Sequence, residues 1–206
     1  MTSVPLGIPD LNTAASGHLC LFHETDAVLR ATVRDFMRVA IDDPRQGAAL
    51  FGAPEVVHQT LASLELDLGR ALDDDVRRGR LIVIESDPDP DICLELLRSA
   101  YSALQQRGYE KVRSVSRATW GLAGFPLPED QLWLDSQLNE VLAGRPALLI
   151  CTYDLGALPT SALVYGGLET HTHTIVSGQV APSPAFVEPP RYFVDRLLHL
   201  PWLTPT

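Results

Sequence analysis

The sequence lacks the glycine-rich signatures through which α/β proteins hold phosphate groups or acyl substrates. Across 206 residues there is no GxxxxGK[ST], no GxGxxG and no GxSxG. The first two are loops in which a strand–helix turn holds nucleotide phosphates, and the third carries the nucleophile of α/β-hydrolases. We therefore expect neither nucleotide hydrolysis nor serine-hydrolase or protease chemistry.

Basic residues, cysteines and long apolar runs are also scarce. Lysine and arginine total 16 against 26 acidic residues, and the formal charge of −10 opposes nucleic-acid binding. The three cysteines form no CxxC pair, which predicts reduced core thiols. No stretch approaches the ~18 apolar residues of a spanning helix, and Met1–Gly17 lacks a signal-peptide pattern. We expect a soluble cytoplasmic protein without cofactor, nucleic-acid partner or membrane partner.

Strand-like and helix-like segments alternate along the chain, as is typical of layered α/β domains. The run Leu81–Ile84 shows no polar alternation and predicts a central strand, whereas Asp73–Gly79 predicts an exposed, charged approach to it. The expected fold is a three-layer, mostly parallel sheet flanked by helices. Residues 1–16 are expected to be a flexible lead, 17–192 the domain and 193–206 a proline-containing tail. Strands are predicted at 18–22, 47–52, 81–84, 112–120, 147–153 and 174–180, and helices at 25–41, 56–66, 92–107, 129–142 and 161–168.

Histidine and cysteine side chains lie in or next to three of these strands. His18 and Cys20 are two residues apart and therefore point into one layer, with Glu24 following at the carboxyl end of the strand. His171 and His173 precede the last strand; if this segment is extended, the two histidines share one face and, with His18 or Cys151, could complete a tetrahedral metal site. The alternative is a buried cysteine with hydrogen-bonded histidines. We expect His18, Cys151 and His171 to converge on one cavity.

Further polar groups lie at carboxyl ends of strands, where open α/β sheets place their ligands. Glu85 ends the predicted central strand, and Tyr153 lies in the sequence Cys151-Thr-Tyr-Asp154. Arg117 and Trp120 share one strand end, where an arginine could bind a carboxylate or phosphate and an indole could form an apolar wall. A core tryptophan and a surface ion pair are the alternative interpretation.

Six short motifs follow one another along the chain: residues 18–25 (HLCLFHET), 79–85 (GRLIVIE), 108–120 (GYEKVRSVSRATW), 138–139 (LN), 151–154 (CTYD), and His171 with Gly178. In this order they resemble the MEDS domain, the methanogen/methylotroph sensory domain of prokaryotic regulators. The resemblance spans roughly residues 17–192. It implies a RecA-like sheet without a phosphate loop and a role in sensing small organic molecules.

Two motifs depart from the family pattern. The family often has Glu-Met-Thr-Trp where this chain has Arg117-Ala-Thr-Trp120, and His-Pro where it has His171-Thr172. The exchange of glutamate for arginine inverts a charge beside the presumed pocket. It indicates either an anionic ligand or a lost one.

The sequence therefore predicts a stand-alone, non-enzymatic sensor of a small organic molecule. Its signal would leave through a regulatory protein partner such as an anti-sigma factor, a kinase or a transcription regulator, and homodimer formation stays open. One alternative is a ligand-free interaction regulator, and another is a metal-dependent enzyme using His18, Cys20 and His171. The predicted ligand-binding residues are His18, Cys20, Glu24, Glu85, Arg117, Trp120, Cys151, Tyr153 and His171.

Overall fold

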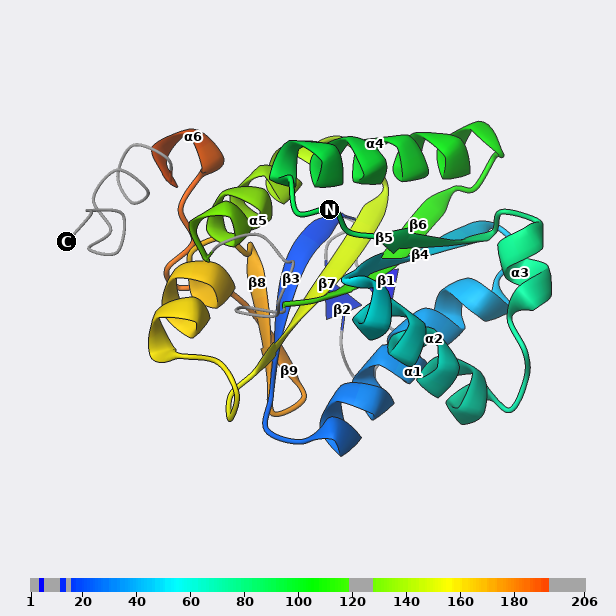
Figure 1. Cartoon of the computed structure of the whole chain (residues 1–206), viewed down its shortest axis with the longest axis horizontal. Helices are drawn as coiled ribbons and strands as arrows, with labels where there is room; N and C mark the ends of the chain where they lie inside the picture. The colour runs from blue at the N-terminus through cyan, green and yellow to red at the C-terminus, as the bar shows by residue number, and fades with distance from the viewer. Residues whose placement is uncertain (1–3, 6–11, 14–15, 119–127, 193–206) are drawn as a thin grey trace.

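Seven strands form one sheet in the order β5-β4-β6-β7-β3-β8-β9 (Figure 1). The computed structural model describes residues 4–5, 12–13, 16–118 and 128–192. All neighbouring strands are parallel except β8 and β9, and a separate antiparallel pair joins β1 (Val4–Pro5) to β2 (Asn12–Thr13). The strands of the large sheet are β3 (Gly17–His23), β4 (Gln46–Gly52), β5 (Leu81–Glu85), β6 (Lys111–Arg117), β7 (Ala147–Asp154), β8 (His173–Val176) and β9 (Gln179–Pro182).

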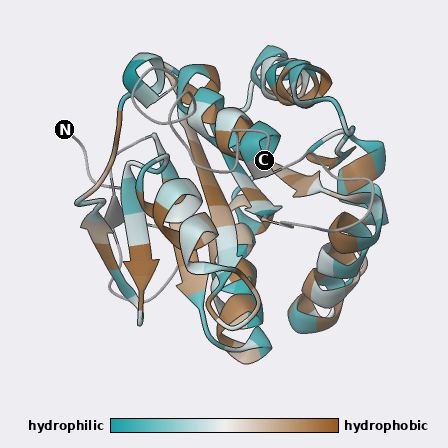
Figure 2. Ribbon diagram, turned by 60° about the vertical axis from the view of Figure 1, so that its left-hand side comes forward, coloured by the Kyte–Doolittle hydropathy of each residue, from teal (hydrophilic) through white to brown (hydrophobic). Residues whose placement is uncertain are grey.

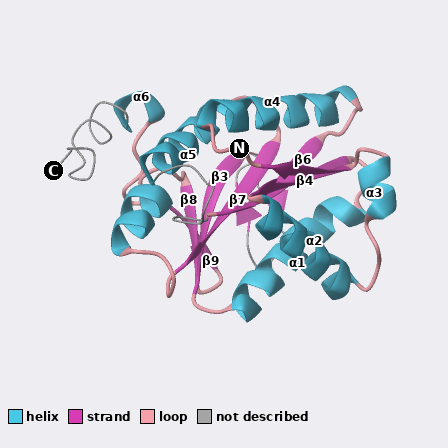
Figure 3. Cartoon of the chain, in the orientation of Figure 1, coloured by secondary structure: helices cyan, strands magenta, loops and turns pink. Residues whose placement is uncertain are grey.

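Helices cover both faces of this sheet, which confirms the expected three-layer architecture (Figure 3). One face is covered by α1 (Asp26–Asp42) and α2 (Pro54–Leu68). The other is covered by α4 (Pro90–Gln106), α5 (Pro128–Leu142) and the π-helix η1 (Ala162–Leu168). The short helices α3 (Asp73–Arg77) and α6 (Pro189–Tyr192) pack at the edges, against β5 and α5 respectively.

Local sequence signals set the helix ends. The hydroxyl of Thr25 accepts a hydrogen bond from the Val28 amide at 3.3 Å and so caps the start of α1. Pro54 occupies the first turn of α2, where its missing N–H leaves no partner unsatisfied. The same helix ends at Gly69, whose φ of 67° is the left-handed conformation that glycine adopts without strain.

Alternation along the strands divides the apolar residues between two cores. Leu19 and Leu21 of β3 face α1 and α2, whereas Cys20 and Phe22 face α4 and α5. Brown, hydrophobic stretches run through the strands in Figure 2, between paler and teal segments, and these stretches supply the two cores. The cores on the two faces are separated only by the thickness of the sheet.

The prediction that Leu81–Ile84 forms a central strand is wrong, because β5 lies at the edge of the sheet. Its continuous apolar run has a different origin. Helices α2 and α4 contact its two faces, and α3 also packs against it, so that both faces are at least half-covered although one backbone edge is not paired. The segment Asp73–Gly79 is not an exposed approach throughout, since it contains α3 and the buried Asp75.

The single last strand predicted at 174–180 is instead a hairpin of β8 and β9. Ser177 and Gly178 form its turn with φ of 48° and 73°. Two consecutive left-handed residues are the geometry that joins antiparallel strands by a two-residue loop. None of the helices in the described residues combines the length and apolar character needed to cross a membrane.

Candidate functional site

A buried histidine–cysteine cluster lies on the α5 face of the sheet. Strands β3 and β7 are neighbours, and their register aligns Cys20 with Cys151 and Phe22 with Tyr153. His18 is two residues before Cys20, so it projects to the same face. His171 reaches this face from the connection between η1 and β8. We call His18, Cys151 and His171 the HCH cluster.

His18 contacts both of the other side chains of the HCH cluster. His18 Nε2 lies 3.1 Å from Cys151 Sγ, and the rings of His18 and His171 have centroids 3.9 Å apart with 39° between their planes. The nitrogen and sulfur atoms that could act as ligands all lie within 4.8 Å of one another. His18 and His171 are fully buried, and Cys151 is 2% exposed. The expected convergence of these side chains is therefore found, whereas the cavity that they were expected to share stays a prediction.

Hydrogen bonds fix which nitrogen of His171 carries its proton. Nδ1 lies 3.0 Å from the Gly166 carbonyl and 2.9 Å from the Thr170 hydroxyl, which itself donates to the same carbonyl. A carbonyl only accepts, so Nδ1 carries the proton and Nε2 carries the lone pair. That Nε2 atom is buried and has no hydrogen-bond partner among the described residues.

Burial keeps the cluster uncharged. Burial lowers the pKa of His171 to about 3. Burial and, second, the neighbouring His171 hold the pKa of His18 well below its ordinary value. Burial and the Asp135 carboxylate raise the pKa of the Cys151 thiol well above its ordinary value. At neutral pH the cluster therefore consists of two neutral imidazoles and a thiol, which is not the thiolate of a reactive cysteine.

A second polar group adjoins the cluster. The Tyr153 hydroxyl donates to Asp135 Oδ2, and Gln131 donates to Oδ1 of the same carboxyl at 2.9 Å. Burial raises the pKa of Asp135 to about 7. The Tyr153 ring meets that of His171 edge-on, with centroids 5.6 Å apart. Helix α5 is thereby joined to the cluster through one buried acid and one tyrosine.

A cavity of about 260 Å³ lies on the opposite face of the sheet, between α1 and α2. Arg117 and Thr152, which are register partners on β6 and β7, form its floor with Val115. Thr152 is 1% exposed, and its hydroxyl has no hydrogen-bond partner among the described residues. The helices contribute Asp26, Leu29, Arg30, Val33, Arg34, Gln59, Thr60, Ser63, Leu64 and Asp67.

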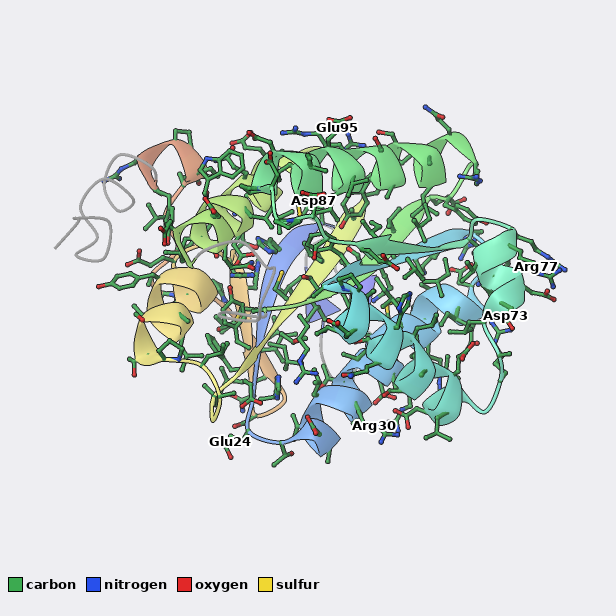
Figure 4. The ribbon with its side chains drawn as sticks, viewed as in Figure 1. Glu24, Arg30, Asp73, Arg77, Asp87 and Glu95 are labelled. Carbon is green, nitrogen blue, oxygen red and sulfur yellow. The ribbon has the colours of Figure 1, made fainter. Side chains whose placement is uncertain are left out.

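The residues predicted to share one pocket are thus divided between locations. Cys20 and Tyr153 lie on the face of the HCH cluster, but Arg117 lines the cavity on the other face. Glu24 is exposed in the β3–α1 turn, at the outer edge of the molecule in Figure 4. Glu85 is exposed at the end of β5, 3.2 Å from His58. Trp120 lies outside the described residues.

The prediction missed Asp135, Gln131 and Thr152. Gln131 and Asp135 are four residues apart on α5 and both are buried, so two polar residues interrupt the apolar face of this helix. That interruption was the available signal. Thr152 follows Cys151 on a strand, so alternation sends it to the other face. The set proposed for a metal enzyme also changes, because Cys151 and not Cys20 joins the two histidines.

Comparisons with known proteins identify both fold and family. A KaiC-like protein from the hyperthermophilic archaeon Pyrococcus horikoshii OT3 is similar in structure, with a TM-score of 0.55 and 14% identity over 85% of this chain and 80% of that one. This likeness confirms the RecA-like fold. No curated protein matches the chain. The profile of the MEDS family, described as the methanogen/methylotroph, DcmR sensory domain, matches residues 17–172. The chain therefore belongs to the MEDS family of sensory domains.

Proposed function

We propose that this chain is a regulatory domain of the prokaryotic cytoplasm that binds a small organic anion between α1 and α2 and signals through a protein partner. The cavity beside Arg117 and Thr152 is the observation that carries the proposal. Membership of a sensory-domain family supports the general role.

The position of the cavity supports ligand binding. The chain leaves β3 toward α1 on one face of the sheet and leaves β7 toward η1 on the other. Open α/β sheets bind ligands outside the carboxyl ends of strands at such a switch point. Asp26 opens α1 directly after β3, and Thr152 lies two residues before the end of β7; both line the cavity.

The lining of the cavity favours a short organic anion. Its volume of about 260 Å³ lies just below the usual range of drug-sized pockets, which begins at roughly 300 Å³. Val33, Leu64 and Val115 supply apolar walls, and Arg117 places a cation at the floor. A guanidinium can hold a carboxylate through two parallel hydrogen bonds. The unpaired hydroxyl of Thr152 would gain a partner from the same ligand.

Ligand entry would be transmitted through α1 and α2. Arg30 of α1 and Asp67 of α2 form an ion pair at 2.5 Å, and both residues line the cavity. A ligand that separates or draws together these helices would change this link and the outer surface they present. The protein partner would bind this surface with an affinity that depends on the positions of α1 and α2.

A ligand-free interaction regulator is less well supported. The large exposed apolar side chains of the described residues are spread over α1, α2, α3, α4, the β7–η1 connection and β8. Docking surfaces usually show such residues in one contiguous patch. The described part of the chain therefore offers no single apolar face for this alternative.

Binding of short carboxylates tests the proposal. Acetate, propanoate and butanoate would be titrated by calorimetry, with the corresponding primary amides as neutral controls. We expect at least one carboxylate to bind and its amide not to bind. Arg117→Gln should weaken that binding roughly 10- to 100-fold, the usual effect of losing a hydrogen bond to a charged group.

Arg38→Gln is the matched control, since Arg38 is an exposed arginine of α1 that does not line the cavity. Its affinity should equal that of the wild type. Failure of every carboxylate to bind, or equal affinity in Arg117→Gln, would remove the α1–α2 cavity as the site of an anionic ligand.

A further inference from the structure

The HCH cluster plays no part in the cavity on the other face, and its chemistry requires a separate explanation. Two strands and the η1–β8 connection bring His18, Cys151 and His171 together, with donor atoms within 4.8 Å of one another. All three side chains are buried. Two imidazoles and one thiol are donors of the kind that zinc prefers.

His171 carries an unsatisfied acceptor directed into the buried face. Its Nδ1–H is held by the Gly166 carbonyl and the Thr170 hydroxyl, so the lone pair is on Nε2, which has no hydrogen-bond partner in the described residues. A buried polar atom without a partner destabilises a protein, because it has lost its hydrogen bonds to water and gained none in exchange. Histidines that bind metals characteristically hold one nitrogen to a carbonyl or carboxylate and present the other to the ion.

The distances need only small changes to accommodate an ion. Ligand atoms around one tetrahedral zinc lie roughly 3.3–3.6 Å apart, given Zn–N near 2.0 Å and Zn–S near 2.3 Å. His18 Nε2 and Cys151 Sγ are already 3.1 Å apart. Small movements of the two rings and the thiol would bring the three atoms to this spacing.

Supports around the cluster restrict those movements. Asn139 of α5 donates to the Thr170 carbonyl at 2.7 Å, next to His171 in sequence. The Thr172 hydroxyl and amide both bond the carbonyl of His18, at 2.8 and 3.0 Å. The backbones that carry the two histidines are therefore joined directly, as a preorganised metal site requires.

We propose that His18, Cys151 and His171 bind one Zn²⁺ ion, with a non-protein ligand in the fourth position. The Cys151 thiol releases its proton to solvent as the sulfur binds, whereas both imidazoles bind in their neutral form. The site is independent of the α1–α2 cavity, which lies on the opposite face of the sheet. If no carboxylate binds, the zinc proposal still stands. If no zinc binds, the proposal of a carboxylate site between α1 and α2 still stands.

Direct metal titration tests this assignment on the full chain. Protein stripped with a chelator would be titrated with Zn²⁺ against a chromophoric competitor and, separately, with Co²⁺. We expect one equivalent of either ion and a thiolate-to-cobalt charge-transfer band in the near ultraviolet. Absence of stoichiometric zinc binding, or of the band, overturns the proposal.

Cysteine variants assign the ligand. Cys151→Ala should weaken zinc binding by more than about 100-fold, beyond the 10- to 100-fold loss that follows removal of an outer partner. Cys20→Ala is the control, because Cys20 is buried on the same face in register with Cys151 but outside the three-donor set. It should keep wild-type affinity and the cobalt band.

Equal losses in both cysteine variants, or full binding by Cys151→Ala, would contradict the assignment. Circular dichroism reports whether each variant folds. If Cys151→Ala does not fold, the comparison of wild type with Cys20→Ala still decides the matter. A cobalt–thiolate band that persists without Cys20 supports Cys151, since the remaining thiol, Cys93, lies on α4 bonded to the Asp87 carbonyl, and loss of the band refutes it.

Discussion

Cys151 and Thr152 are consecutive residues of β7 whose side chains lie on opposite faces of the sheet. Cys151 contacts His18 in the HCH cluster, and Thr152 lines the cavity between α1 and α2. One peptide unit thus joins the two sites for which we propose ligands. Changes at the two positions can be compared directly, because both residues are buried in the same strand.

Thr152→Val should raise the free energy of unfolding by about 1 kcal/mol while it weakens carboxylate binding. The hydroxyl of Thr152 is buried and has no hydrogen-bond partner in the described part of the chain, and valine replaces it by a methyl group of similar shape. Urea denaturation measures the stability and calorimetry the binding. A destabilised variant would show that the hydroxyl has a partner in the free protein.

Gly167→Ala should destabilise the protein by about 1–3 kcal/mol, the usual effect of overpacking a core. A methyl group at this position of η1 would lie 2.5 and 2.7 Å from ring atoms of Phe22 and 3.2 Å from Cys20 Sγ. Gly52→Ala is the control, because its added methyl group would meet Val56 Cγ1 at an ordinary contact distance of 3.9 Å. Thermal unfolding of both variants should separate them, and equal melting temperatures would show that η1 shifts freely.

The free energy of unfolding of the Asp135→Asn variant should increase relative to that of the wild type as the pH rises from about 4 to about 7. The pKa of Asp135 is about 7 in the folded protein against 3.8 ordinarily, so in this window only the folded state keeps the proton. The contribution of Asp135 to the wild-type free energy of unfolding is therefore largest below pH 4 and is lost as the pH rises through 7.

The full change is up to about 4 kcal/mol, at 1.36 kcal/mol for each pKa unit. Urea denaturation of both proteins at several pH values measures it. The two buried histidines titrate in the opposite sense, but they are common to both proteins and cancel in the difference. A difference that does not vary with pH would mean that Asp135 is ionised throughout.

Glu85→Gln should change the free energy of unfolding by less than about 1 kcal/mol, as is usual for exposed ion pairs. Glu85 pairs with His58 at the surface, where the two side chains are 53% and 59% exposed. Neither carboxylate nor zinc affinity should change. A changed affinity for a carboxylate or for zinc in this variant would indicate that Glu85 takes part in ligand binding, as the sequence predicted.

Sequence patterns predicted positions within a strand better than positions between strands. Alternation indicated that His18 and Cys20 share one face of their strand. It could not indicate that Arg117 aligns with Thr152 rather than Cys151, because pairing between β6 and β7 depends on register. This is why Arg117 was expected beside the histidines and lies on the opposite face. Asp135 was missed for a similar reason, since its partner Tyr153 becomes visible only when α5 is placed over β7.

The same limit applies to β5 and to the HCH cluster. Apolar content indicates burial, and helices cover both faces of β5 at the edge of the sheet, where Ile82 and Val83 stay partly exposed. The convergence of His18, Cys151 and His171 was predicted from three segments with the right residue types. The tautomer of His171, and with it the nitrogen that lacks a partner in the described residues, depends on the backbone carbonyl of Gly166. No pattern of side chains in the sequence indicates this contact.

The strand order has a consequence for how the chain folds. β3 pairs only with β7 and β8, and the contact between His18 and Cys151 spans 133 positions. Closing so long a loop costs chain entropy before any pairing can offset it, which slows folding of such topologies. During synthesis β4, β5 and β6 can assemble with their helices while β3 still lacks both neighbours. Strand β3, the first strand of the large sheet to be synthesised, is therefore among the last to pair with its neighbours.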